Sequence, residues 1–127
     1  MEALIYLDTH VVAWLYAGRL DLLSRRASGL VEESDLLISP AVLLELEYLH
    51  EIGRLTVGGS RIVRSLRAQI GLDVCPLPFP GVVESALDQR WTRDPFDRLI
   101  VGQAVLAGRP LLTKDAAIRR HYRHGTW

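Results

Sequence analysis

Four short, largely apolar runs, each leading into a segment with helical character, limit the folds that this chain can adopt. The runs are ALIYL at residues 3–7, DLLIS at 35–39, LDVCPL at 72–77 and PLLTKD at 110–115. They lack the alternation of polar and apolar residues that marks a strand with one solvated face. Strands buried on both faces and separated by helices are typical of α/β proteins. The pattern therefore predicts an α/β fold with a parallel sheet covered by helices on both faces.

Helix boundary signals support this interpretation along the chain. Ser39 followed by Pro40 supplies an N-cap and a first-turn proline, and Gly53 marks the end of the helix that follows. Gly58 and Gly59 indicate a turn between two helices, not a linker between domains. We therefore expect residues 1–127 to form a single domain. The expected helical segments are residues 11–18, 21–33, 40–53, 60–70, 81–90, 96–107 and 116–122.

Composition excludes several classes of protein and of site. The 127 residues include 15 basic and 15 acidic side chains, so the net charge does not identify a partner. Cys75 is the only cysteine, which excludes an intramolecular disulfide and a multi-cysteine zinc site and fits a reducing compartment. The N-terminus lacks the pattern of a secretory signal, and no apolar run approaches the roughly 20 residues of a membrane span. We therefore expect a cytoplasmic protein that does not associate with a membrane.

Acidic residues follow the predicted strands at the sheet edge where functional groups gather in parallel sheets. Asp8 ends the first strand and Asp115 follows the last one, so both are expected at this edge. Glu45 lies in the second turn of the helix after the second strand. Asp97 lies in the first turn of the 96–107 helix, where its side chain leans toward the helix N-terminus. The sequence therefore predicts that these four acids converge.

Most of these acids also have an ordinary structural explanation. Asp94 before Pro95 is a typical N-cap, and the helix dipole favours an ionised carboxylate at Asp97. Asp115 similarly fits the N-cap of the short helix after it. Four converging carboxylates, however, repel one another unless a cation lies between them, and Mg²⁺ prefers such oxygen ligands. Together the acids indicate a metal-dependent site that acts on phosphodiesters.

Three blocks of sequence resemble a known family. They are LIYLDTHVVAWL at 4–15, ISPAVLLELEYLHEIGRL at 38–55 and DPFDRLIVGQAVLAGRPLLTKDAAI at 94–118. In this order they resemble the PIN domain and, within it, the VapC-type ribonuclease toxins of toxin-antitoxin modules. The resemblance implies a three-layer α/β/α sandwich with a central parallel sheet of four to five strands. Family members usually end with a fifth strand, and because only HYRHGTW remains here, that strand is expected to be short.

The resemblance also implies roles for individual residues. Asp94 is then mainly a helix cap that reaches the metal through water, whereas Glu47 would point about 200° away from Glu45 around their helix. Thr9 and Thr113 match positions whose hydroxyl groups support the site. The catalytic residues and ligands of Mg²⁺ or Mn²⁺ are expected to be Asp8, Glu45, Asp97 and Asp115.

The implied activity is that of an endoribonuclease toxin that uses a metal-activated water to cleave RNA phosphodiesters. Residues 109–127 hold five basic residues and one acidic residue, a net charge of +4 that suits an RNA backbone. A homodimer and a cognate VapB-type antitoxin are the partners that the resemblance implies. The candidate RNA-binding residues are Lys114, Arg119, Arg120 and Arg123.

Three other interpretations are open at the level of sequence. A metal-dependent phosphatase of the haloacid dehalogenase type also has an aspartate after its first strand, but it needs a second one at the position of His10. A receiver domain needs a phospho-accepting aspartate after its middle strand, where this chain has Cys75 and Pro76. A PIN-like domain that binds RNA or protein without cleavage is disfavoured by the intact quartet of acids. His10 itself is expected to be a surface or helix-capping residue.

Overall fold

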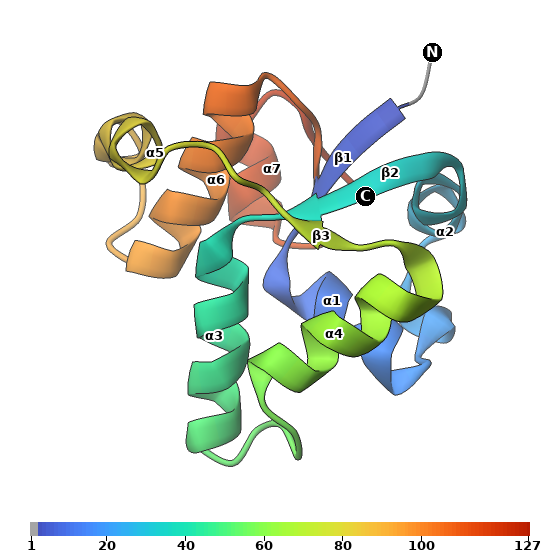
Figure 1. Cartoon of the computed structure of the whole chain (residues 1–127). Coiled ribbons are helices and arrows are strands. Elements are labelled where there is room, and N and C mark those ends of the chain that lie inside the picture. Colours follow the sequence, from blue (N-terminus) through green and yellow to red (C-terminus); the bar gives the residue numbers. More distant parts are fainter. Residues whose placement is uncertain (1–2) are drawn as a thin grey trace.

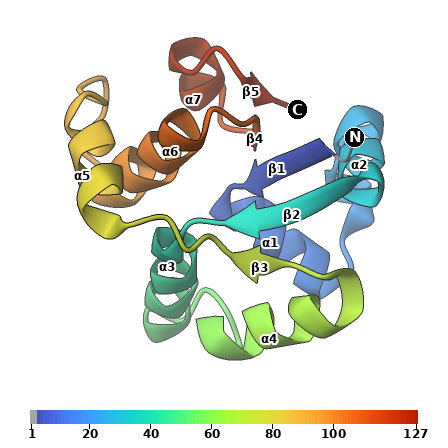
Figure 2. The same ribbon diagram turned by 45° about the horizontal axis from the view of Figure 1, so that its top comes forward.

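The structure of the chain, a computed structural model, describes residues 3–127 and is built on a five-stranded parallel sheet (Figure 1). The strands lie in the order β3-β2-β1-β4-β5, and every neighbouring pair is parallel (Figure 2). The last three residues of the central strand β1, Ile5, Tyr6 and Leu7, are at most 2% exposed. The strands are β1 Ala3–Leu7, β2 Ser34–Ile38, β3 Asp73–Val74, β4 Leu111–Leu112 and β5 Gly125–Thr126.

Helices cover both faces of this sheet. α1 and α4 lie on one face, and α6 and α7 lie on the other (Figure 1). The predicted three-layer α/β/α arrangement is therefore confirmed. Among residues 3–127, no helix combines the length and apolar character needed to cross a bilayer. The helices are α1 Thr9–Ala17, α2 Arg25–Glu33, α3 Pro40–Glu51, α4 Gly59–Ile70, α5 Phe79–Leu87, α6 Pro95–Ala107 and α7 Ala116–His121, with a 3₁₀ turn η1 Leu20–Leu22.

Several predicted element boundaries are wrong. The segment 21–33 is not one helix but η1 followed by α2, because Ser24 is extended and its hydroxyl caps a new helix by accepting from Ala27 N at 3.0 Å. The third strand is two residues long, and its pairing with β2 ends with the bond that Cys75 N donates to Ile38 O at 2.8 Å. Helix 81–90 is instead α5, Phe79–Leu87.

The fifth strand is present and short, as predicted. β5 pairs with β4, and Thr113 N donates to Thr126 O at 3.0 Å just beyond the end of β4. The segment before β5 is held to the core by Tyr122, which is 6% exposed. Its hydroxyl donates to Arg109 O at 2.5 Å. The chain after α7 therefore adds a fifth strand to the sheet beside β4.

Close packing holds α6 in position against α5. A Cβ on Gly102 would lie 2.8 Å from Ala86 N, so only glycine permits this approach of the two helices. The Ser85 hydroxyl also donates to Gly102 O at 2.7 Å. Because α6 carries Asp97 near its N-terminus, this contact fixes the helix that carries that carboxylate against α5.

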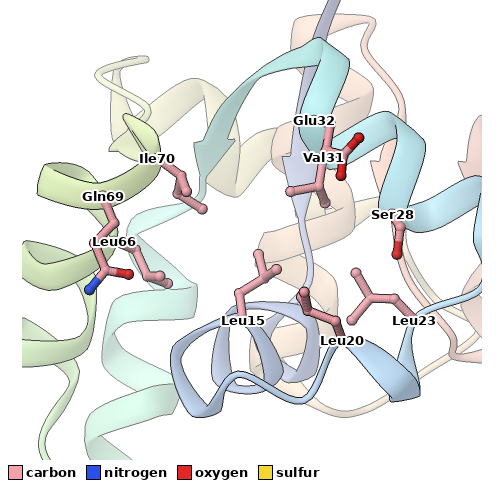
Figure 3. A pocket seen from close by; sticks show the side chains of 9 residues that line it. All are labelled: Leu15, Leu20, Leu23, Ser28, Val31, Glu32, Leu66, Gln69 and Ile70. Carbon is pink, nitrogen blue, oxygen red and sulfur yellow. The ribbon is translucent and has the colours of Figure 1, made fainter.

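The helices around α1 leave an apolar cavity of about 220 Å³ (Figure 3). Leu15 of α1, Leu20 of η1 and Leu66 of α4 contribute apolar side chains to its lining. Glu32 and Gln69 are the charged and amide groups among the lining residues. The acids selected from the sequence do not line this cavity.

Candidate metal and phosphodiester site

Asp8 lies at the carboxyl end of the central strand. Its backbone N–H donates to Leu112 O of β4 at 3.0 Å, which continues the sheet pairing past β1. Its side chain caps α1, where Oδ1 accepts from Thr9 N at 2.8 Å. Asp8 is only 4% exposed, so this carboxylate depends on hydrogen-bond donors for its stability. Sheet geometry and helix capping thus place a buried carboxylate at the end of β1.

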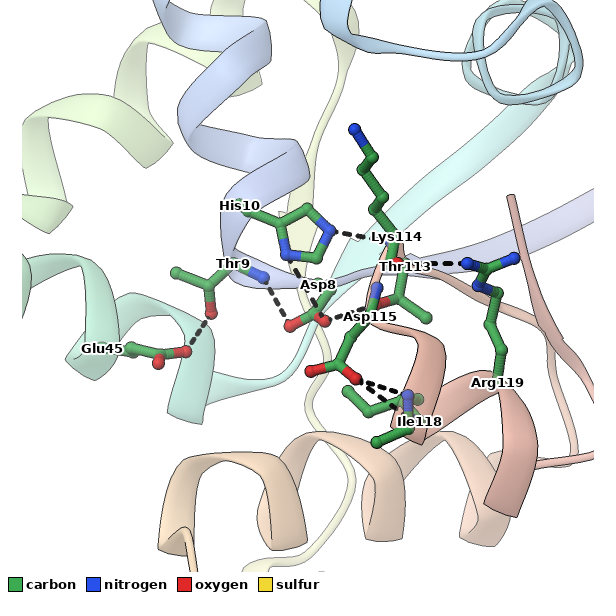
Figure 4. A network of polar contacts seen from close by, with 10 residues as sticks. Asp8, Thr9, His10, Glu45, Thr113, Lys114, Asp115, Ile118 and Arg119 are labelled. Carbon is green, nitrogen blue, oxygen red and sulfur yellow. Dashed lines mark hydrogen bonds and ion pairs between the residues drawn. The ribbon is translucent and has the colours of Figure 1, made fainter.

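Thr113 connects Asp8 to Asp115 across a separation of more than 100 residues in sequence (Figure 4). Its hydroxyl donates to Asp8 Oδ2 at 2.7 Å and accepts from Asp115 N at 3.0 Å. Asp115 caps α7 through Oδ1, which accepts from Ala117 N at 2.8 Å and Ile118 N at 3.1 Å. The buried hydroxyl group of Thr113 therefore helps to hold the loop after β4 against the end of β1.

Thr9 makes the corresponding connection to Glu45 on α3 (Figure 4). Its hydroxyl donates to Glu45 Oε1. Burial raises the pKa of the Glu45 carboxyl, the bond from Thr9 opposes this rise, and the charges of Asp8 and Asp94 add to it. Glu47 points elsewhere, as predicted, and accepts from Gly59 N at 3.0 Å.

Asp94 and Asp97 differ in burial and in hydrogen bonding at the start of α6. Asp94 is exposed and caps the helix, since its Oδ1 accepts from Phe96 N at 2.8 Å and Asp97 N at 3.1 Å. Asp97 is half-buried, and burial raises its pKa to about 7, with further contributions from the charges of Asp94, Asp8, Asp115 and Glu45. With a pKa of about 7, Asp97 is about half ionised at neutral pH, so the helix dipole does not keep this carboxylate fully ionised. Desolvation and like charges outweigh the dipole.

The four predicted acids line one cavity of about 210 Å³. This convergence on one sheet edge is the arrangement expected from the sequence. The donor set fits a hard divalent cation, because it consists of carboxylates with threonine hydroxyl groups beside them. As the side chains lie, no group of three or more Asp, Glu, His or Cys residues in 3–127 is arranged to hold a metal ion. Binding would therefore need rotation of the carboxylates or intervening waters, which Mg²⁺ commonly keeps. The cavity is lined by Asp8, Thr9, His10, Glu45, Leu49, Asp97 and Asp115.

His10 belongs to this cavity, whereas the sequence suggested a surface or capping residue. Its Nε2 accepts from Lys114 N at 2.9 Å, and its Nδ1 lies 3.7 Å from Asp8 Oδ2. Burial lowers the pKa of the imidazole, although the charges of Asp8 and Asp115 oppose this. A neutral ring with its proton on Nδ1 satisfies both contacts. Only its position two residues after Asp8 pointed to this role in the sequence.

The candidate RNA-binding residues do not lie together. Lys114 is exposed, with Nζ 5.9 Å from the centre of the Trp14 ring, and Arg119 donates to Lys114 O at 3.2 Å. Arg120 is exposed on α7, whose N-terminus is at the acidic cavity. Arg123 instead lines a separate cavity with Pro110, at the amino end of β4. Lys114, Arg119 and Arg120 therefore lie on α7 or on the loop before it, next to Asp115, whereas Arg123 does not.

Comparisons with known proteins identify the family of this chain. The PIN domain family profile matches residues 5–124. The chain is 33% identical over 121 residues to Ribonuclease VapC22 of Mycobacterium tuberculosis (strain ATCC 25618 / H37Rv), with 92% of this chain and 91% of that protein covered. Its fold matches a chain in the crystal structure of VapBC2 from Rickettsia felis bound to a DNA fragment from their promoter, with a TM-score of 0.67, 17% identity and 92% of each chain covered. The chain therefore belongs to the PIN domain family, and within that family it is a VapC-type protein.

Proposed function

We propose that this protein is a Mg²⁺- or Mn²⁺-dependent endoribonuclease, the toxin of a VapBC-type toxin-antitoxin module. The observation that carries the proposal is the shared cavity of Asp8, Glu45, Asp97 and Asp115, in which burial and the surrounding carboxylates raise the pKa of Asp97 to about 7. Such crowding of negative charge is unfavourable without a cation. The name of the 33% identical relative, a ribonuclease, supports RNA as the substrate.

The carboxylates of Asp8, Glu45, Asp97 and Asp115 are the groups that would hold the cation. A bound divalent ion would supply a water of lowered pKa and stabilise the negative charge that develops on the phosphate. Thr9 and Thr113 keep their partner carboxylates from rotating freely, which limits the number of arrangements in which the acids can bind. Asp94 acts as the cap of α6 and sets the position of the first turn that carries Asp97.

RNA would approach over the elements that carry the acids. Lys114, Arg119 and Arg120 lie on or next to α7, so they are suited to contact phosphates near the cavity. We leave Arg123 out of this surface because it lines a cavity with Pro110 at the other end of β4. This proposal predicts salt-sensitive binding in which the three nearer residues contribute most.

The proposed partners are a VapB-type antitoxin and a second copy of the chain. The apolar cavity lined by Leu15, Leu20 and Leu66 suits an apolar side chain of an antitoxin segment (Figure 3). The structural match to VapBC2 from Rickettsia felis, bound to a DNA fragment from their promoter, supports this kind of partner. The homodimer and the cytoplasmic location expected from the sequence stay predictions.

Cleavage of RNA in the presence and absence of metal tests the proposed activity. Purified protein should cleave single-stranded or structured RNA with Mg²⁺ or Mn²⁺ and should not cleave it with EDTA. Asp97→Asn should reduce the rate by at least about 100-fold, because it removes a carboxylate from the metal-binding group. Asp94→Asn is the matched control and should keep nearly the wild-type rate, since asparagine also accepts the two capping bonds.

Three results would contradict the proposal. Cleavage that persists in EDTA would mean that no divalent ion is needed. RNA that binds but stays intact under every metal condition would instead favour a PIN-like domain that binds without cleavage. Release of phosphate from small phosphomonoesters, with RNA left intact, would favour the phosphatase-like alternative.

A further inference from the structure

Two aromatic rings stack in parallel outside the acidic cavity. Trp91 lies in the loop between α5 and α6, and His121 is the last residue of α7. Their ring centroids are 4.9 Å apart and the angle between the ring planes is 4°. The two residues are 30 positions apart in sequence, and neither was selected by the sequence patterns described above.

Both rings are held in place by hydrogen bonds as well as by the stack. Trp91 Nε1 donates to Gln89 Oε1 at 2.8 Å, and His121 Nδ1 donates to Ala117 O at 2.9 Å. Trp91 is half-buried and packs against the core, whereas His121 is exposed. The imidazole therefore covers one side of the indole and presents its own outer face to solvent. A ring fixed in this way loses little conformational entropy when a flat group binds to it.

The elements that carry these rings also carry the acids of the cavity. Asp115 caps α7, so His121 lies six residues along that helix, at about 1.5 Å per residue or about 9 Å from the cap. Trp91 precedes Asp94, the cap of α6, by three residues, and Asp97 lies in the first turn of that helix. The stacked pair is thus about two helical turns from the acidic cavity, within reach of a nucleotide next to the one being cleaved.

The charges around the pair favour an anionic chain. Arg90 and Arg93 are exposed on either side of Trp91 in the loop, and Arg120 is exposed next to His121. Asp88 and Asp94 are the exposed acids at the two ends of the same loop, so the three arginines outnumber the acids by one. Exposed aromatic rings among arginines are the combination with which proteins bind single-stranded nucleic acid, since each base has a flat face and each phosphate a charge.

We propose that the Trp91–His121 pair is a stacking site for one unpaired nucleobase of the RNA substrate, on the outer face of His121. The inference rests on the proposed function because it assumes an RNA substrate. It adds a base-binding subsite to the metal site and predicts that the enzyme prefers RNA with an accessible base next to the cleaved bond. The stack also attaches the α5–α6 loop to α7, so a test must separate binding of bases from packing of the loop.

Binding of two hexanucleotides, measured in EDTA so that no cleavage occurs, distinguishes stacking of bases from packing of the loop. One is an ordinary single-stranded RNA hexamer, and the other is a fully abasic hexamer with the same ribose-phosphate backbone. We expect wild-type protein to bind the base-containing strand about tenfold more tightly, a ratio typical of stacking on one aromatic group. The double variant Trp91→Leu/His121→Ala should bind both strands equally, with the affinity for the abasic strand unchanged.

Two further variants serve as controls. His121→Phe keeps an aromatic face over Trp91 and should restore most of the preference for the base-containing strand. His124→Ala removes an exposed histidine three residues further along the chain that packs edge-on against Tyr122, and it should leave the preference at its wild-type value. Thermal unfolding of each variant, followed by circular dichroism, identifies any loss of fold.

Equal binding of the two hexamers by wild-type protein would overturn the inference, and so would an unchanged preference in the double variant. Either result together with Mg²⁺-dependent cleavage of RNA by wild-type protein would leave the proposed function intact. A base preference that depends on Trp91 and His121, without cleavage under any metal condition, would instead support the subsite and refute the nuclease activity.

Discussion

Replacing Asp97 by asparagine should stabilise the metal-free protein at alkaline pH while it reduces activity. The folded-state pKa of Asp97 is raised from its ordinary value of 3.8 to about 7 by burial and by the neighbouring carboxylates. The folded state therefore binds more protons than the unfolded state between these two values. Stability contributed by this group falls as the pH rises from about 4 to about 7, and above that the loss is complete. Asparagine is uncharged at every pH and avoids this loss.

The size of the effect follows from the two pKa values. The difference between 3.8 and about 7 corresponds to about 4 kcal/mol of unfolding free energy, at about 1.4 kcal/mol per pKa unit. Asp97 is only half-buried, so solvent screening reduces this figure to about 2 kcal/mol. We therefore expect Asp97→Asn to be about 2 kcal/mol more stable than wild type at pH 8.5 and less than about 1 kcal/mol more stable at pH 4.5.

Urea denaturation in EDTA, followed by circular dichroism at both pH values, measures this difference. Asp35→Asn is the matched control, because Asp35 is an exposed acid on β2 and does not line the acidic cavity. Its stability relative to wild type should change little between the two pH values. A gain for Asp97→Asn that is equal at pH 4.5 and pH 8.5 would refute the electrostatic explanation. A loss of stability at pH 8.5 would show that the ionised carboxylate is stabilised in the folded state.

Three further predictions concern the site and the core beneath it. Thr113→Val should lower the free energy of unfolding by about 1–3 kcal/mol, because the buried hydroxyl bonded to Asp8 and Asp115 is lost. Thr113→Ser keeps the hydroxyl and should be much closer to wild type in stability. An equal loss of stability in both variants would refute the role of the hydroxyl. Gln103→Leu should raise the free energy of unfolding by about 1–3 kcal/mol, since Gln103 is fully buried and neither amide atom has a partner among the described residues; a decrease would indicate that a buried water satisfies the amide. Mg²⁺ should bind more tightly at pH 8 than at pH 6 and release a proton near neutral pH, because ionisation of Asp97, with its pKa of about 7, precedes binding. Calorimetry in buffers of different ionisation enthalpy measures the released proton, and an affinity for Mg²⁺ that does not change with pH would contradict the role of Asp97.

Local chemistry explains why the α/β fold and the position of the acids were predictable. Apolar runs without alternation indicate buried strands, and N-cap residues act within three or four positions of themselves. Ser39 with Pro40, Asp94 with Pro95 and Asp115 all cap the helices that they were expected to cap. Boundaries were predicted less well where short-range signals compete, as at Ser24, which starts a new helix inside a segment with helical character.

The order of the strands, and with it the chemistry of the site, was decided by the tertiary structure. β1 pairs with both β2 and β4, which brings Thr113 to Asp8 although they are 105 residues apart. No periodicity in the sequence encodes that contact. The pKa of Asp97 likewise depends on burial, on the charge of its neighbour Asp94 and on the charges of Asp8, Asp115 and Glu45, which are distant in sequence, so the helix dipole considered alone does not account for it.

The sequence by itself indicated the buried strands, most of the helices with their caps, and the four acids at the carboxyl ends of strands and in the first two turns of helices, because these follow from interactions between near neighbours. Tertiary structure alone decided that His10 contacts the loop of Asp115, that Glu45 is joined to Thr9, and that Trp91 stacks on His121. The physical reason is that burial, strand pairing and charge repulsion depend on which distant segments come into contact, and those contacts exist only once the sheet has formed.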